Sequence, residues 1–204
     1  MVGYKYNTRS EKYCAVNCLY RNKKGELEGT NTDGEAALRS YESKFGSVKG
    51  KTVMILGTGG AAKAVSAYFL TGVGERGKVI IVGRSGHGKD FAEYIKADWV
   101  EWSKISANLA NVDLIINCTT IGFGEQEEHS PLKPEEIQQC KESTVFFDII
   151  YQPVDTLFQQ IARENRKKTM GGLLMNLEQA VLAFNYANYQ ANSEVVTREA
   201  MRKS

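Results

Sequence analysis

The sequence predicts an α/β fold in which helices cover both faces of a parallel sheet, a doubly wound, Rossmann-like arrangement. Short runs of apolar, mostly β-branched residues alternate with segments of helical periodicity. The central runs lack period-two alternation, which indicates burial on both faces of a sheet. One run is followed by a glycine-rich turn and then by a helical pattern, as in a nucleotide-binding βαβ unit.

The elements of the sheet are expected in a regular order. Strands are predicted at Thr52–Leu56, Lys78–Val82, Leu114–Cys118 and Val145–Ile149, with a weaker strand near Trp99–Trp102. Helices are predicted at Ala61–Thr71, Lys89–Lys96, Trp102–Ala110, Pro134–Lys141, Asp155–Arg166 and Asn176–Asn188. Alternation of this kind implies right-handed crossovers between parallel strands.

The N-terminal part shows a different pattern. Tyr13–Arg21 and Glu26–Gly29 are candidate strands, and a helix is expected from Asn31 to about Phe45. Because this segment is too small for a sheet core of its own, we interpret it as the end of another domain, joined by the helix to the nucleotide domain.

Charge and composition exclude several classes of function. The chain has 204 residues with 26 basic and 24 acidic side chains, and a net charge of +2 gives no reason to expect nucleic acid or an anionic membrane as a partner. No apolar run approaches a bilayer span, and no signal-peptide core is visible. None of the 4 cysteines forms a CxxC pair and only 2 histidines occur, so we expect no metal site. Cys118 is expected to be a buried thiol of a reduced, cytoplasmic protein.

The glycine-rich turn after the first sheet strand predicts a dinucleotide site. Gly57 allows a tight turn, Gly59 lets a pyrophosphate approach the backbone, and Ala62 lets the helix pack closely on the strand. The N–H groups of the helix start, around Gly60 and Ala61, favour phosphate charge. The alternative is a glycine-rich turn that binds nothing.

The residues after the second strand favour NADP over NAD. Arg84, Ser85 and Lys89 offer two cations and a hydroxyl, and no acidic residue precedes Asp90. An acidic residue at this position commonly binds the ribose of NAD, whereas arginine can bind the 2′-phosphate of NADP. The alternative is a solvated basic loop.

Polar residues at later strand ends and a second glycine turn are further candidates. Thr119, Thr120 and Gly122 follow a strand end, where ligands of doubly wound sheets bind, although an ordinary loop would show the same pattern. Asp148 lies in an apolar run, so it either pins a loop or faces a cleft. Gly172 and Gln179 belong to the second glycine turn and the helix that follows it. Glycine at position 172 would let the backbone contact a flat ring, and Gln179, two helical turns later, can point along the same cleft. A purely structural helix is the alternative.

Taken together, these segments resemble the shikimate/quinate dehydrogenase family. The matching segments are AVN at 15–17, GTNTDG at 29–34, GTGGAA at 57–62, GRS at 83–85, NCTTIGF at 117–123, DIIYQPVDT at 148–156 and GLLMNLEQA at 172–180. The match spans almost the whole chain in order. Related dehydrogenases share the nucleotide-binding fold but not this set of segments.

The resemblance implies a reversible, NADPH-dependent reduction of 3-dehydroshikimate to shikimate, a step of aromatic amino acid (chorismate) biosynthesis. It places Asn17, Asp33 and Gln179 on substrate hydroxyls and Tyr151 near the substrate carboxylate, with Asp33 as the acidic half of a Lys–Asp catalytic pair. It assigns NADP to the glycine turn, to Arg84 with Ser85, and to Gly172 and Met175 beside the nicotinamide.

The sequence also departs from the family pattern. Family members carry a substrate domain, with a serine pair and the catalytic lysine, before the segment that corresponds to Asn17, whereas only 16 residues precede Asn17 here. Lys5 and Lys12 do not lie in the family's lysine context, and Gly83 replaces the usual asparagine. We therefore expect a substrate-domain remnant at 1–30, an NADP-binding domain at 31–188 and a C-terminal helix or tail at 189–204.

Two functions remain open from the sequence. One is an NADP-dependent dehydrogenase, and the other is a non-catalytic NADP(H)-binding or regulatory module. In either case we expect an uncovered apolar and strand-edge surface around Tyr4–Tyr20 to cause self-association.

Overall fold

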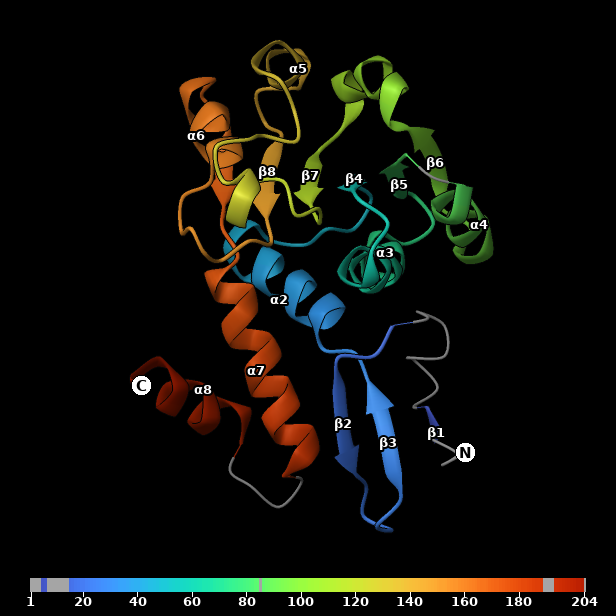
Figure 1. Ribbon diagram of the computed structural model, residues 1–204, viewed down its shortest axis with the longest axis vertical. Coiled ribbons are helices and arrows are strands. Elements are labelled where there is room, and N and C mark those ends of the chain that lie inside the picture. The colour runs from blue at the N-terminus through green and yellow to red at the C-terminus, as the bar shows by residue number, and fades with distance from the viewer. Residues whose placement is uncertain (1–4, 7–14, 85, 189–192, 204) are drawn as a thin grey trace.

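A computed structural model describes residues 5–6, 15–84, 86–188 and 193–203 (Figure 1). The predicted site residue Ser85 and the residue Lys12 lie outside these ranges. The side chains of Lys5, Tyr6 and His87 are likewise not described.

A parallel sheet of six strands forms the centre of the molecule, which confirms the predicted α/β, doubly wound fold. The strand order is β6-β5-β4-β7-β8-β9, and every neighbouring pair is parallel. The strands are β4 (Thr52–Leu56), β5 (Lys78–Gly83), β6 (Asp98–Glu101), β7 (Leu114–Asn117), β8 (Val145–Asp148) and β9 (Lys168–Met170). The first five lie within a residue or two of their predicted positions.

The sheet contains one strand that the sequence did not predict, because β9 pairs with β8 beyond the last predicted strand. Its three residues, Lys168–Met170, include a single apolar side chain, Met170, which is buried. An edge strand of three residues is too short to show the alternation of apolar and polar residues that would reveal it in the sequence.

Helices cover both faces of the sheet. The helices of the described residues are α2 (Asp33–Phe45), α3 (Gly60–Val73), α4 (Gly86–Ile95), α5 (Pro134–Gln139), α6 (Leu157–Glu164), α7 (Leu173–Ala187) and α8 (Glu194–Lys203), with 3₁₀ helices η1 (Trp102–Asn111) and η2 (Gly124–Gln126). The predicted helix at Trp102–Ala110 is therefore a 3₁₀ helix. Among the helices of the described residues, none has the length and apolar character needed to span a lipid bilayer.

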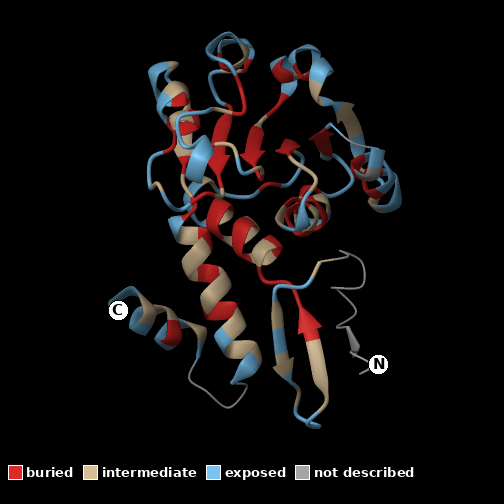
Figure 2. Cartoon of the chain, in the orientation of Figure 1, coloured by how far each residue is buried: buried red, intermediate tan, exposed pale blue. Residues whose placement is uncertain are grey.

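The core has one layer on each face of the sheet. In β4, Val53 and Ile55 pack in the cluster that contains α2, α3, α4 and α7, whereas Met54 and Leu56 pack in the cluster that contains η1, α5 and α6. Burial of each such side chain contributes roughly 1.5–3 kcal/mol. The four central strands, β4, β5, β7 and β8, are buried on both faces (Figure 2), which explains why their sequences show no alternation.

The first helix of the main domain, α2, connects it to a small N-terminal sheet. Strand β3 (Leu27–Thr30) pairs with β2 (Cys18–Arg21) antiparallel and with β1 (Lys5–Tyr6) parallel. The predicted strand Tyr13–Arg21 thus begins at Cys18 in the described residues. Figure 1 shows this small sheet below the main one, beside α7.

Helices α2 and α3 cross closely at Gly34. A Cβ atom on Gly34 would lie 2.4 Å from the carbonyl oxygen of Ala64 and 2.5 Å from Tyr68 Cδ2. Only glycine fits at this crossing, so Gly34 fixes how near the start of α2 lies to the glycine turn before α3.

The C-terminal segment is a helix, α8, held by ion pairs. Arg198 donates to both carboxylate oxygens of Glu178, at 2.5 and 2.7 Å, and Arg39 of α2 pairs with Glu194 at 2.6 Å. These contacts join α8 to α7 and α2, and α7 carries residues of the site described next.

Candidate functional site

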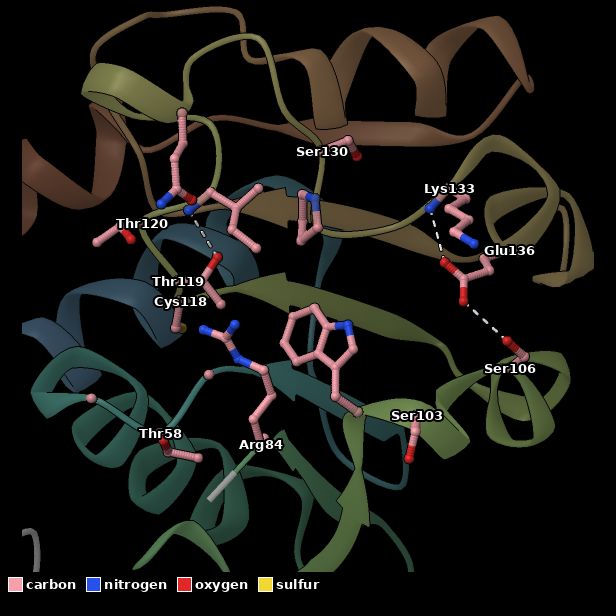
Figure 3. A pocket seen from close by; sticks show the side chains of 17 residues that line it. Thr58, Arg84, Ser103, Ser106, Cys118, Thr119, Thr120, Ser130, Lys133 and Glu136 are labelled. Atoms are coloured by element: carbon pink, nitrogen blue, oxygen red, sulfur yellow. Dashed lines mark hydrogen bonds between the residues drawn. The ribbon is translucent and has the colours of Figure 1, made fainter.

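A cavity of about 990 Å³ opens at the carboxyl ends of β4, β5 and β7 (Figure 3). Its inner wall consists of residues that follow these strands, and its outer wall comes from η1 and the segment before and within α5. The predicted residues among its lining are Gly57, Gly59, Arg84, Thr119 and Thr120. The cavity therefore lies where a doubly wound sheet binds nucleotides.

The glycine turn forms one wall of this cavity. Gly57 has a φ of +114°, and a Cβ atom there would lie 2.9 Å from the carbonyl oxygen of Cys118, so the tight turn requires glycine. Gly59 precedes the first turn of α3 and has no neighbour within 4 Å of an added Cβ. Gly60 begins α3, while Ala62 is buried against the sheet, so the free N–H groups of the helix start lie beside an open backbone.

Arg84 supplies a cation to the inner wall of the cavity. Figure 3 shows its side chain directed from the end of β5 into the cavity. Lys89 does not line the cavity; it is exposed and pairs with Glu93 at 3.7 Å. Of the basic residues predicted to meet a phosphate, only Arg84 reaches the cavity within the described residues.

Gly83 is explained by its neighbours. A Cβ atom on Gly83 would lie 2.5 Å from Thr58 Cγ2 and 2.7 Å from Trp99 Cη2. The indole of Trp99 thus occupies the space that a larger side chain at position 83 would need. The departure from the usual asparagine is therefore matched by the packing around it.

The loop after β7 is held by the buried side chain of Asn117. Its Oδ1 accepts from the N–H of Thr119 at 3.0 Å and from Thr119 Oγ1 at 2.7 Å, and its Nδ2 donates to the Ile121 carbonyl at 3.0 Å. These bonds present Thr119 and Thr120 to the cavity. Gly122, with a φ of +103°, packs near Thr156 and does not line the cavity.

Asp148 pins the next loop. Its Oδ1 accepts from the Ile150 N–H at 3.1 Å and from Asn117 Nδ2 at 3.2 Å, and its Oδ2 accepts from Thr156 Oγ1 at 2.7 Å. Burial raises the pKa of Asp148 to about 6, although these hydrogen bonds lower it in part. Asp148 lines neither of the two pockets described here, so of the two roles open from the sequence the structure supports the loop-pinning one.

A second pocket of about 340 Å³ contains every residue predicted to bind the substrate. Its lining is Asn17, Asp33, Ala61, Ile149, Tyr151, Met175, Asn176 and Gln179. These residues come from the segment before β2, from α2, α3 and α7, and from the loop after β8. Ala61 belongs to the glycine turn whose preceding residues line the large cavity, so the two pockets adjoin there.

Hydrogen bonds connect the polar groups of the second pocket. Asn17 Nδ2 donates to Asp33 Oδ1 at 2.7 Å and to Thr32 Oγ1 at 3.2 Å, and the Thr32 N–H donates to Asn17 Oδ1 at 2.9 Å. Thr32 Oγ1 lies 3.4 Å from Gln179 Oε1, so the network extends from α2 to α7. Burial raises the pKa of Asp33, and the bond from Asn17 lowers it in part.

Gly172 fixes the start of α7 behind this pocket. Its N–H donates to the Ile150 carbonyl at 3.0 Å, and a Cβ atom would lie 2.1 Å from the Ile149 carbonyl oxygen. The glycine thus permits close packing against the Tyr151 loop. Met175, one turn further along α7, is buried and lines the pocket.

Comparison with known proteins agrees with this geometry. The profile of the family described as shikimate/quinate 5-dehydrogenase matches residues 39–164. The chain belongs to this family.

Similar proteins carry the same family name. A shikimate dehydrogenase (NADP(+)) of Caldanaerobacter subterraneus subsp. tengcongensis is 33% identical over 86% of this chain and 62% of its own length. One from Methanocaldococcus jannaschii is 32% identical over 93% of this chain and 68% of its own length. The chain thus spans about two thirds of the length of these relatives.

Solved structures of the family superpose on the chain. A shikimate dehydrogenase in complex with NADP+ matches with a TM-score of 0.83 and 26% identity, over 99% of this chain and 70% of that one. The Thermus thermophilus enzyme in complex with NADP(H) and shikimate matches with a TM-score of 0.79 and 26% identity, over 99% and 72%.

Within the described residues, no lysine lines the second pocket. Lys63 of α3 lies over the Phe91 ring, with its Nζ 5.5 Å from the ring centroid. No lysine therefore accompanies Asp33 in the part of the chain that the structure describes.

Sequence reasoning missed the outer wall of the large cavity. This wall contains Trp102, Ser103, Ser106, Gln126, Ser130, Pro131, Lys133 and Glu136. Glu136 accepts from Ser106 Oγ at 3.0 Å and from the Lys133 N–H at 2.9 Å (Figure 3). No motif marks these residues, because they meet only through the packing of η1 against α5. Asn176 of the second pocket was also missed, although it lies inside the recognised motif.

Proposed function

We propose that this chain is a shikimate dehydrogenase-type oxidoreductase that binds NADP(H) in the large cavity and shikimate or 3-dehydroshikimate in the second pocket. The observation that carries the proposal is the meeting of the two pockets at one glycine turn. Five of the predicted cofactor residues line the large cavity, whereas all four predicted substrate residues line the second pocket, together with the predicted cofactor residues Ala61 and Met175.

The residues of the large cavity fit NADP. The open backbone at Gly59 accommodates a pyrophosphate, and the α3 N-terminus offers N–H groups to its charge. The guanidinium of Arg84 matches the 2′-phosphate, to which it can donate two parallel hydrogen bonds. When bound, NADPH supplies the hydride for a carbonyl reduction.

The second pocket suits a ring that carries several hydroxyl groups. Asn17 and Gln179 provide amide donors and acceptors, and Asp33 provides an acceptor at its Oδ2. Reduction of a ketone also requires a proton at its oxygen. The half-buried carboxylate of Asp33 can hold a proton-bearing partner beside that oxygen.

A second candidate is an NADP(H)-binding module without turnover. It is favoured by the absence of a lysine from the described lining of the second pocket. A lysine with a lowered pKa is the proton donor expected for the catalytic pair with Asp33.

One assay separates the two candidates. Protein shown to be folded and to bind NADPH is incubated with shikimate and NADP, and the appearance of NADPH is followed. Turnover that Asp33→Asn abolishes, while NADPH binding is unchanged, supports the dehydrogenase. NADPH binding without turnover supports the module, and no NADPH binding contradicts both.

We also propose self-association through the N-terminal sheet. Strand β2 is an edge strand of this sheet within the described residues, and Leu19 on it is 57% exposed. An apolar edge strand is a template for pairing with a second copy. Light scattering should give a mass that rises with concentration above 22.7 kDa. Leu19→Lys should suppress the rise and Val195→Lys on α8 should not, while a strict monomer at high concentration contradicts the proposal.

The intracellular location stays a prediction from the sequence. So does the exclusion of metal ions, although the described residues contain no group of three or more potential metal ligands.

A further inference from the structure

We propose that Asn176 is a substrate-binding residue that determines which hydroxyl-bearing rings the second pocket accepts. This inference rests on the proposed function. It deepens that proposal, because it assigns a ligand contact to a residue outside the predicted set.

Asn176 lies at the pocket through the geometry of α7. It is three residues before Gln179, so the two side chains project from the same face of the helix, and both line the pocket. Gln179 Nε2 lies 3.3 Å from Asn176 Oδ1. Asn176 therefore accepts a hydrogen bond from the Gln179 amide through its own Oδ1.

The Nδ2 group of the Asn176 amide remains available to a ligand. Nδ2 has two N–H groups and makes no hydrogen bond to another described residue. The side chain is half-buried at the pocket, where an unpaired donor favours a ligand oxygen over an apolar group.

The polar chain across the pocket fixes where this donor lies. It runs from Asn176 to Gln179, Thr32, Asn17 and Asp33, each linked to the next by a contact of 2.7–3.4 Å. The amide of Asn176 thus stands at one end of this series of contacts and the carboxylate of Asp33 at the other. A ring with adjacent hydroxyl groups can accept from Nδ2 of Asn176 and Nε2 of Gln179 while donating to Asp33.

The test is a binding experiment, which does not depend on turnover. Isothermal titration of shikimate, in the presence of saturating NADP, is performed on the unaltered chain, on Asn176→Ala and on Asn176→Leu. Alanine has a higher helix propensity than asparagine, and leucine keeps the volume, so at least one variant should retain α7. Asn108→Leu in η1 is the matched control, because it is remote from the pocket lining. NADP affinity serves as the control for folding.

Loss of the contact should weaken shikimate binding by about three- to tenfold in both variants, the cost of one hydrogen bond, and leave the control unchanged. The titrations are repeated with shikimate analogues that lack one ring hydroxyl at a time. For the analogue without the contacted hydroxyl, the variants and the unaltered chain should bind equally.

Three results would overturn the assignment in distinguishable ways. Equal shikimate binding by all forms would remove Asn176 from the pocket's recognition and leave the proposed function standing. A loss of the same size for every analogue would show that Asn176 acts only by positioning Gln179. Absence of shikimate binding by the unaltered chain, with NADP bound, would overturn the proposed function together with the assignment.

Discussion

Arg84 is the residue on which the choice between NADP and NAD depends. It points into the large cavity from the end of β5, and within the described lining its only basic companion is Lys133 on the opposite wall. Because Lys89 is engaged with Glu93 on the surface, it is not expected to replace Arg84.

We predict that Arg84→Ala weakens NADP binding by roughly ten- to a hundredfold and NAD binding far less. The variant loses charge-assisted hydrogen bonds to a phosphate that NAD lacks, at about 1.5–3 kcal/mol. Fluorescence titration with both reduced cofactors measures the effect. Arg76→Ala, an exposed arginine before β5, is the matched control. Equal losses for the two cofactors would refute the 2′-phosphate assignment.

Asp148 makes stability depend on pH. Its folded-state pKa of about 6 lies above the ordinary aspartate value of 3.8, so the folded chain binds the proton more tightly than the unfolded chain. The associated stabilisation is complete below pH 3.8 and is lost as the pH rises through 6. We compare the free energy of unfolding in urea of the unaltered chain with that of Asp148→Asn. The value for the unaltered chain minus that for the variant should fall by about 2 kcal/mol between pH 4.5 and pH 7.5. A difference that does not change with pH would contradict this cause.

At the scale of elements, the crossing of α2 and α3 brings the substrate residues to the glycine turn. Asp33 begins α2, and Gly34 contacts α3 directly. The same short distance places Ala61 in the second pocket. The spacing of the two helices therefore sets the distance between the cofactor and substrate residues.

We predict different effects for two glycine-to-alanine changes, one at this crossing and one at the glycine turn before α3. Gly34→Ala should lower stability by about 1–3 kcal/mol or more, because its Cβ would overlap the backbone of Ala64. Gly59→Ala should leave stability unchanged, since nothing lies within 4 Å of its Cβ, but weaken NADP binding by roughly tenfold or more by obstructing the pyrophosphate. Thermal unfolding and NADPH titration measure the two effects. Loss of stability in Gly59→Ala with normal NADP affinity would contradict the assignment of the turn.

Strands and helices were predictable to different degrees. Strands β4 and β7 could be found because complete burial gives unbroken apolar runs, whereas β9 could not, since Lys168–Met170 is short and mostly polar. The tight turn at Gly57 could be predicted from a local motif, and the substrate contact proposed for Asn17 comes from the family resemblance. The outer wall at Ser106 and Glu136 does not, because only tertiary packing joins residues that far apart in sequence.

At the scale of the whole molecule, two pockets from different parts of the chain adjoin at one turn. The segment before β2 contributes Asn17, α2 contributes Asp33, and α7 contributes Gln179, while the ends of the main-sheet strands contribute the inner wall of the large cavity. The ion pairs of Arg198 and Arg39 hold α8 against α7 and α2, the two helices that carry substrate residues. We therefore expect cofactor and substrate to bind side by side.

The most direct test of this arrangement is an interligand nuclear Overhauser measurement on the chain with NADP and shikimate together. We predict transferred effects for both ligands and a cross-peak between the nicotinamide ring protons and the shikimate ring protons. Gly59→Ala should abolish the cross-peak through loss of NADP. Binding of both ligands without any cross-peak between them would contradict the claim that the two pockets form one active site.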